Sequence, residues 1–452
     1  MAKRKGSELL SVGQKKLLTG TMEETAIDDE AFRSKFVEEI TYDVIKPDSL
    51  LPTDTESTTP VVFTIHPAAR HAVDARNIIL NVAFKVLKRK TGDSEWVKMD
   101  ATDKCLVVTN ALNSMFSELL VHFNGVCVES NGREYGKLAY LKALHFTSEE
   151  EKKTTLRTAM YMPDLPGSMD TYFPSETLNP GQQMRSGLIA NSAERKLSGR
   201  LWSDVLDVRL PIPETVAIQI KLFPAKSELC LKTERPAQGQ DYAAKYKLVI
   251  VDASLRVPRI RLKTSLPSTI KYNFTRHKLF SFLHPRKMQH YGPMTVTSGA
   301  LPDRMIMGMC KADAYDGDWN NNMLRFQNFG ITKCLLKAND RHLPTMFGYQ
   351  TNFRDRDYNE AYNGMYQYLK SKAIIDIDKY DSDFSFFSFE LSPAQSSSLY
   401  NKRQKDHGVT TLSASFAPTE SSDNMVILVW AIYRAKYSIG PNGIFTPDPD
   451  IG

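Results

Sequence analysis

The sequence IILNVAFKV at residues 78–86 has a large apolar side chain at every second position. Successive side chains of a β-strand point to opposite faces, so this pattern places one apolar face on a core and leaves the other toward solvent. Residues 218–222, IQIKL, repeat the pattern. Most apolar stretches after the N-terminal region have this period, and the sequence therefore predicts a predominantly β protein.

Two stretches nearer the C-terminus indicate sheets packed in layers. Residues 425–433, MVILVWAIY, are apolar on both faces, which is typical of a central strand buried between two layers. Residues 384–391 carry several phenylalanines, and the adjacent pair Phe386 and Phe387 breaks the alternation as a β-bulge would. We interpret both stretches as core strands of a sandwich.

Two amphipathic helices are expected within this β background. Tyr135–Phe146 has Leu138, Leu141 and Leu144 on one face, and Tyr358–Leu369 has an aromatic stripe interrupted by Gly364. Each helix follows a predicted hairpin, with turns at Asn124-Gly125 and near Asn339-Asp340. The repeated order of strand, hairpin and helix predicts two structural copies offset by about 210 to 230 residues.

Segments without periodicity indicate linkers and loops. Residues 232–245 are polar and form the best linker between the halves. Residues 147–199 and 265–301 are rich in Pro, Gly, Ser and charged residues, and we expect them to be long loops.

Composition excludes several classes of protein. The 452 residues are 42% hydrophobic and 24% charged, and the longest apolar run is far shorter than the ~20 residues of a membrane-spanning helix. No apolar segment follows the basic residues 1–5, so we expect no signal peptide and a cytosolic or nuclear protein.

The cysteines are odd in number, widely spread and without a Cys-x-x-Cys pair, which argues against a disulfide framework or a zinc site. We expect buried thiols at Cys105, Cys127, Cys230, Cys310 and Cys334.

No catalytic, cofactor or metal site is predicted. The sequence has no phosphate-binding glycine loop, dinucleotide fingerprint or Gly-x-Ser-x-Gly elbow. None of the nine histidines has the close spacing of metal ligands, and residues 313–319 lack the alternating ligands of a calcium loop. The strand at residues 255–263 places Arg259, Arg261 and Lys263 on one face, which we interpret as a solvated face in preference to a phosphate-binding stripe.

The N-terminal region is locally basic. The residues that could contact nucleic acid, a neighbouring subunit or the import machinery are Lys3, Arg4, Lys5, Lys15 and Lys16. An acidic cluster follows at residues 23–30, and few apolar residues are present to offset the entropy of ordering. We expect these residues to form a mobile arm. The alternative to a binding role is that they form only a solvated tail.

Three further segments resemble a known family. Residues 199–231, 246–257 and 301–393 are similar, in this order, to the double jelly-roll major capsid proteins of Polinton/Maverick-type elements and adintoviruses. The first segment resembles the closing strands of that family's first roll. The second segment resembles the opening strand of the family's second roll, and the third resembles the core of that second roll. The sequence departs from the family at Trp319-Asn320-Asn321-Asn322, where an Asn-Pro-Phe-like run is expected.

The resemblance implies an all-β fold of two tandem jelly-roll sandwiches with one or two short helices in each half. The expected division is a mobile arm over residues 1–45, a first roll over 46–236, a second roll over 237–440 and a tail over 441–452. The implied function is a non-enzymatic capsid protein, found in the virion, that trimerises into pseudo-hexagonal capsomers around a DNA genome. Its expected partners are neighbouring capsomers, penton and minor capsid proteins, and packaged DNA through non-specific contacts.

Two other classes of function stay open. A two-domain β-sandwich enzyme would need clustered histidines and carboxylates. A carbohydrate-binding or nucleic-acid-binding protein would need exposed aromatic side chains beside polar or basic groups, whereas the aromatic residues here concentrate in apolar strands.

Overall fold

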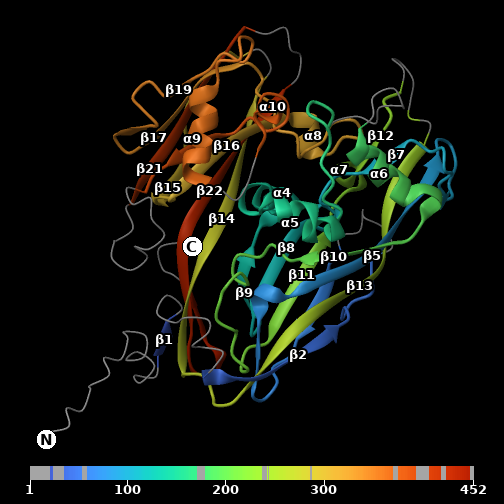
Figure 1. The fold of residues 1–452 in the computed structure, drawn as a ribbon, viewed down its shortest axis with the longest axis vertical. Coiled ribbons are helices and arrows are strands. Elements are labelled where there is room, and N and C mark those ends of the chain that lie inside the picture. Colours follow the sequence, from blue (N-terminus) through green and yellow to red (C-terminus); the bar gives the residue numbers. More distant parts are fainter. Residues whose placement is uncertain are drawn as a thin grey trace, which may run out of the picture.

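The computed structural model describes residues 21–23, 35–52, 59–169, 179–236, 242, 244–285, 288–369, 375–392, 407–418 and 424–447 (Figure 1). Its main strands form two β-sandwiches, the first built from the N-terminal half and the second from the C-terminal half. In each sandwich, we call the sheet on the side of the other sandwich the inner sheet and the remaining sheet the outer sheet.

The first sandwich has an outer sheet in the order β10-β5-β13-β2 and an inner sheet in the order β3-β11-β8-β9. The outer strands are β10 (Arg195–Arg200), β5 (Ile79–Lys90), β13 (Ala244–Leu262) and β2 (Val37–Ile45). The inner strands are β3 (Val61–Ile65), β11 (Ile218–Pro224), β8 (Phe116–Phe123) and β9 (Val126–Ser130). Short strands β4 (His71–Val73) and β6 (Val97–Lys98) extend the outer sheet, and β7 (Cys105–Val107) pairs with β12 (Leu231–Thr233).

The second sandwich has an inner sheet in the order β14-β22-β16-β20 and an outer sheet in the order β15-β21-β17-β18. The inner strands are β14 (Thr269–His284), β22 (Met425–Ile439), β16 (Arg304–Lys311) and β20 (Phe387–Glu390). The outer strands are β15 (His290–Ala300), β21 (His407–Phe416), β17 (Ile331–Ala338) and β18 (Arg341–Leu343). Three short strands complete these sheets: β1 (Thr21–Glu23), β19 (Tyr349–Gln350) and β23 (Phe445–Pro447).

Both sandwiches have the strand order of a jelly roll. Counted along the chain, the first strand pairs with the eighth, the eighth with the third and the third with the sixth; in the facing sheet the order is second, seventh, fourth, fifth. The two halves are therefore structural copies, as the order of elements in the sequence predicts. The prediction of an all-β fold with two tandem jelly rolls is confirmed.

The predicted core strands have the expected burial. Leu80, Val82, Phe84 and Val86 of β5 are buried, and Ile218, Ile220 and Leu222 of β11 face them from the opposite sheet. Strand β22 lies between β14 and β16 and is buried on both sides from residue 425 to residue 433, as its apolar sequence predicts.

Both predicted helices are present. Helix α4 covers Tyr135–Phe146 and α9 covers Asn359–Leu369. Shorter helices α3 (Ala111–Ser114), α5 (Glu149–Lys153), α6 (Pro180–Ile189), α7 (Ser227–Cys230), α8 (Ala312–Asp316) and α10 (Ile377–Tyr380) lie in the connections.

The strand pairing differs from the expected domain boundaries. We expect residues 246–257 to open the second roll, yet they belong to β13, which pairs with β5 and β2 as the last strand of the first roll. The division between the rolls therefore lies between Leu262 and Thr269, not after residue 236. The described residues at the two ends of the polar stretch 232–245 belong to β12 and β13, and both strands lie in the first roll.

Other expectations for the connections are wrong in part. The end of the predicted arm, Val37–Ile45, is strand β2, and part of the predicted tail is strand β23. The predicted loop at residues 265–301 contains the long strands β14 and β15, in which polar residues such as Lys271 and Ser281 lie at exposed positions. Cys127 is exposed, whereas the other four cysteines are buried as expected.

Candidate functional site between the two sandwiches

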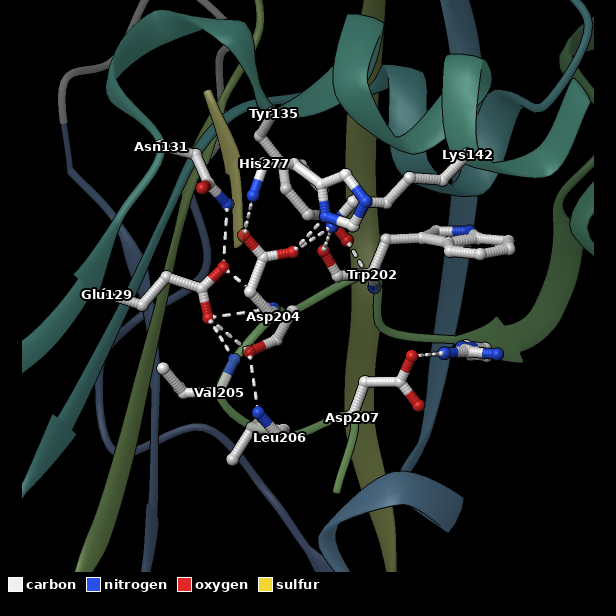
Figure 2. A network of polar contacts seen from close by, with 12 residues as sticks. Glu129, Asn131, Tyr135, Lys142, Trp202, Asp204, Val205, Leu206, Asp207 and His277 are labelled. Carbon is white, nitrogen blue, oxygen red and sulfur yellow. Dashed lines mark hydrogen bonds and ion pairs between the residues drawn. The ribbon is translucent and has the colours of Figure 1, made fainter. Parts of the chain in front are cut away.

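A buried charged cluster joins the two sandwiches (Figure 2). The carboxylate of Asp204, in the connection from β10 to β11, accepts a hydrogen bond from Lys142 of α4. It also accepts bonds of 2.8 Å from the backbone N–H and from ring atom Nδ1 of His277, which lies on β14. One carboxylate of the first roll thus binds the backbone and the side chain of the same residue in the second.

Glu129 holds the loop that carries Asp204. Its carboxylate, at the end of β9, accepts backbone N–H bonds from Asp204 at 2.9 Å and Val205 at 3.2 Å. Asn131 and Ser203 donate side-chain bonds to the same carboxylate. All these partners are donors, so the ionised form of Glu129 is well satisfied and the loop is fixed in one conformation.

Burial and neighbouring charge act in opposite directions on these groups. Burial alone raises the pKa of Asp204, but the Lys142 ammonium and the bond from His277 hold that pKa well below its usual range. Burial and the charge of Asp204 raise the pKa of Glu129. Burial lowers the pKa of His277, so near neutral pH its imidazole is uncharged and donates its Nδ1 proton to Asp204.

An aromatic layer covers the cluster on the side of α4. His145 and Phe146, at the end of α4, have ring centroids 5.3 Å and 5.5 Å from that of Trp430 on β22. His277 packs against the same indole at 5.5 Å. Ring atoms Nε2 of His145 and His277 are buried without a hydrogen-bond partner, so the layer accommodates only neutral imidazoles at low energy.

Further contacts lie at the other end of the contact region between the two sandwiches, which we call the joint. The hydroxyls of Tyr437 and Tyr272 in the second roll donate to the carbonyls of Val205 and Pro211 in the first, at 2.9 Å and 2.8 Å. The ring of Phe123 on β8 packs edge-on against Tyr437 at 6.1 Å. The joint therefore consists mainly of buried groups, and its chemistry is that of a contact between domains.

The residues singled out in the sequence lie elsewhere. Lys3, Arg4, Lys5, Lys15 and Lys16 lie outside the described residues. Arg259 is buried and pairs with Asp43 at 2.9 Å, so it belongs neither to a solvated face nor to a phosphate-binding stripe. Arg261 is exposed beside Glu38 and Glu39. Within the described ranges, no group of three potential metal ligands occurs and no helix is long and apolar enough to cross a membrane.

Sequence reasoning did not find the joint, although one signal was present. Lys142 follows Leu138 by four positions and thus shares the apolar face of α4, which is unusual for a lysine without a buried partner. Its partners Asp204 and His277 are distant in the sequence and have no pattern of their own.

Comparisons with known proteins show that this chain is similar to several of them in fold. The sequence matches no family model. An uncharacterised protein of Caenorhabditis elegans is 21% identical over 313 residues, covering 65% of this chain and 70% of that protein.

Three solved structures show the likeness over most of the chain. A chain of the Sputnik virophage is 10% identical with a TM-score of 0.66, covering 92% of this chain and 90% of its own length. A chain of the PBCV-1 virus capsid is 8% identical with a TM-score of 0.56, covering 91% of this chain and 97% of its own length. The mavirus major capsid protein is 12% identical with a TM-score of 0.53, covering 90% of both chains. Together with the strand order, these likenesses establish that this chain has the double jelly-roll fold.

Proposed function

We propose that this chain is a non-enzymatic major capsid protein that trimerises into pseudo-hexagonal capsomers and builds an icosahedral shell around a DNA genome. Two of the similar structures are a major capsid protein and a virus capsid. The resemblance of residues 199–393 to Polinton/Maverick-type and adintovirus capsid proteins suggests the lineage.

The order of the four sheets is the observation that carries the proposal. The second outer sheet, second inner sheet, first inner sheet and first outer sheet follow one another across the molecule, with α4 and α5 in the middle (Figure 1). Each chain thus contains one buried contact between rolls and leaves an outer sheet at each end. Repetition of that contact between copies is head-to-tail, and such contacts close into a ring when the rotation permits. Three copies would supply six rolls, which matches a pseudo-hexagonal block.

The expected partners follow from this assembly. They are neighbouring capsomers, penton and minor capsid proteins, and the expected location is the virion. We propose that the basic residues Lys3, Arg4, Lys5, Lys15 and Lys16 contact packaged DNA without sequence specificity.

The test is the mass of the purified chain by light scattering, followed by negative-stain imaging of the same peak. We expect three times the mass of the 51.1 kDa chain and a hexagonal outline. A monomer at all concentrations would contradict the proposal and would direct attention to glycan binding and catalysis.

A further inference from the structure

Strand β2 carries an outward row of apolar side chains. Ile40, Tyr42 and Val44 alternate along the strand and are 39%, 61% and 66% exposed. Their partners on β13 are Ile260, Pro258 and Arg256, of which Arg256 is exposed and the other two are buried. The Arg256 guanidinium lies 5.3 Å from the centre of the Tyr42 ring, so the row forms one continuous surface at this end of the sheet.

One position of this row has a covered equivalent in the second roll. Arg256 of β13 pairs with Ile79, the first residue of β5, and with Val44 of β2. Ile432 of β22 pairs in the same way with Arg304, the first residue of β16, and with His277 of β14. Val44 therefore occupies in the first roll the position that His277 occupies in the second.

The surroundings of these two equivalent residues differ sharply. His277 is only 9% exposed because the first roll covers it through Asp204 and through the ring of Phe146, whose centroid lies 5.8 Å away. Val44 is 66% exposed, and the second roll of the same chain lies against the other sheet of the first sandwich. The internal contact thus shows what covers this position of a jelly roll: another roll.

We propose that the row Ile40, Tyr42 and Val44 is a docking surface for a second copy of this chain, whose second roll covers it as the first roll covers His277. This inference rests on the proposed function, because it names the surface through which the copies would assemble. It assigns the contact to one end of the first outer sheet and to one strand.

Charge favours the second roll as the occupant. Glu38 and Glu39, beside the row, are about half exposed, with side-chain values of 45% and 56%. The outward face of the second outer sheet carries Lys333 and Lys337 on β17, alternating with the buried Cys334 and Leu336. Arg261 lies 3.6 Å and 3.8 Å from these two carboxylates, so the contact with Lys333 and Lys337 would add cations to a charge network already present at this strand end.

The opposite end of the first outer sheet is unsuited to this contact. There Arg89 and Lys247 lie 4.7 Å and 4.6 Å from the centre of the Trp96 ring, so the surface is basic like β17. The like charges confine the docking surface to the end that carries β2.

The test compares Val44→Asp and Tyr42→Asp with the control Val97→Asp. Val97 is 45% exposed on β6 of the same sheet, outside the row. We expect light scattering of the wild type and of the control to give a trimer, and each variant in the row to raise the trimer dissociation constant at least tenfold. Val44→Thr, which keeps the β-branched shape, should give a smaller shift, and circular dichroism and thermal unfolding should show all four variants folded.

The outcomes separate this inference from the proposed function. A wild-type trimer that Val44→Asp and Tyr42→Asp leave intact would overturn the docking surface alone. A wild-type monomer would overturn the proposed function and the docking surface with it. A wild-type dimer dissociated by Val44→Asp would indicate pairing of two β2 edges across a twofold axis, and would overturn the second roll as the occupant.

Discussion

Asn124 and Asn339 make the same two hydrogen bonds in the two rolls, each joining a hairpin turn to the backbone at the beginning of the seventh strand or directly before it. The N–H of Asn124 donates to the carbonyl of Ala217 at 2.9 Å, and its Oδ1 accepts from the N–H of the same residue at 2.7 Å. Asn339 makes both bonds with Val409, at 2.9 Å and 3.0 Å. Both asparagines have positive φ, of 48° and 52°. The internal repeat thus extends to individual side chains.

Replacing either asparagine should destabilise the protein by a similar amount. Asn124→Ala and Asn339→Ala each lose two to three hydrogen bonds and place alanine in the left-handed region, at an expected cost of about 2–4 kcal/mol. Asn124→Gly, which avoids the backbone strain, should cost less. Chemical denaturation of the three variants measures this, and unequal losses that leave Asn339→Ala near wild type would contradict the equivalence.

Removing the buried ammonium at the joint should be more harmful than removing an exposed one. Lys142→Met leaves the Asp204 carboxylate buried without its cation, with an expected loss of about 3–5 kcal/mol. Lys104→Met, which breaks the exposed pair with Glu234, should cost less than about 1 kcal/mol. The double variant Lys142→Met/Asp204→Asn should lose less than the sum of its single changes, because the uncompensated charge is gone. Additive losses in urea unfolding would show that the pair is not coupled.

Stability should fall in mild acid because of His145. Burial lowers the pKa of its ring to about 3, below the ordinary 6.5, so the folded protein keeps this imidazole neutral while the unfolded chain takes up a proton. The stability contributed by the neutral His145 is fully present above pH 6.5 and is lost as the pH falls toward 3. The total loss in the free energy of unfolding is roughly 5 kcal/mol. His277, whose pKa is also lowered by burial, acts in the same direction.

The measurement is the free energy of unfolding between pH 7 and pH 4. His145→Phe should flatten this dependence, and His66→Asn, at an exposed position, should leave it as in the wild type. An unchanged slope in His145→Phe would show that the acid sensitivity arises elsewhere.

Gly364 should not tolerate alanine, although alanine is the better helix former. A Cβ at this position of α9 would lie 2.2 Å from the hydroxyl of Tyr349 on β19. We expect Gly364→Ala to lose about 2–3 kcal/mol despite a gain of about 1 kcal/mol in helix propensity. Tyr349→Phe removes the clashing oxygen, so thermal unfolding of the double variant should show a loss smaller than the sum. A stabilised Gly364→Ala would mean that α9 and β19 are farther apart.

Local patterns in the sequence sufficed for the elements but not for their pairing. The alternation at residues 78–86, the helix at Tyr135–Phe146 and the turn at Asn124-Gly125 depend on neighbours in the chain, and each is present as predicted. The assignment of β13 to the first roll depends on its pairing with β2, formed from residues that looked like part of a mobile arm. Period and composition carry no information about which distant strand is the partner.

The joint was beyond sequence reasoning for the same physical reason. Lys142, Asp204 and His277 come from a helix, a loop and a strand, and only the packing of the two rolls brings their charges together. Arg259 looked solvated because its partner Asp43 lies 216 residues away. Burial of a charge is decided by such partners, not by its immediate neighbours in the chain.

The late position of β13 sets the order in which a newly made chain can fold. Asp43 of β2 leaves the ribosome 216 residues before its partner Arg259, a delay of roughly 10–40 s at ordinary rates of synthesis. During that time β2 and β5 expose unpaired edges and apolar faces, which are the surfaces most prone to aggregation. The first roll can close once β13 has been made, when the second roll is still to be synthesised, so fast pairing of β13 with β2 and β5 shortens the time for which these surfaces are exposed.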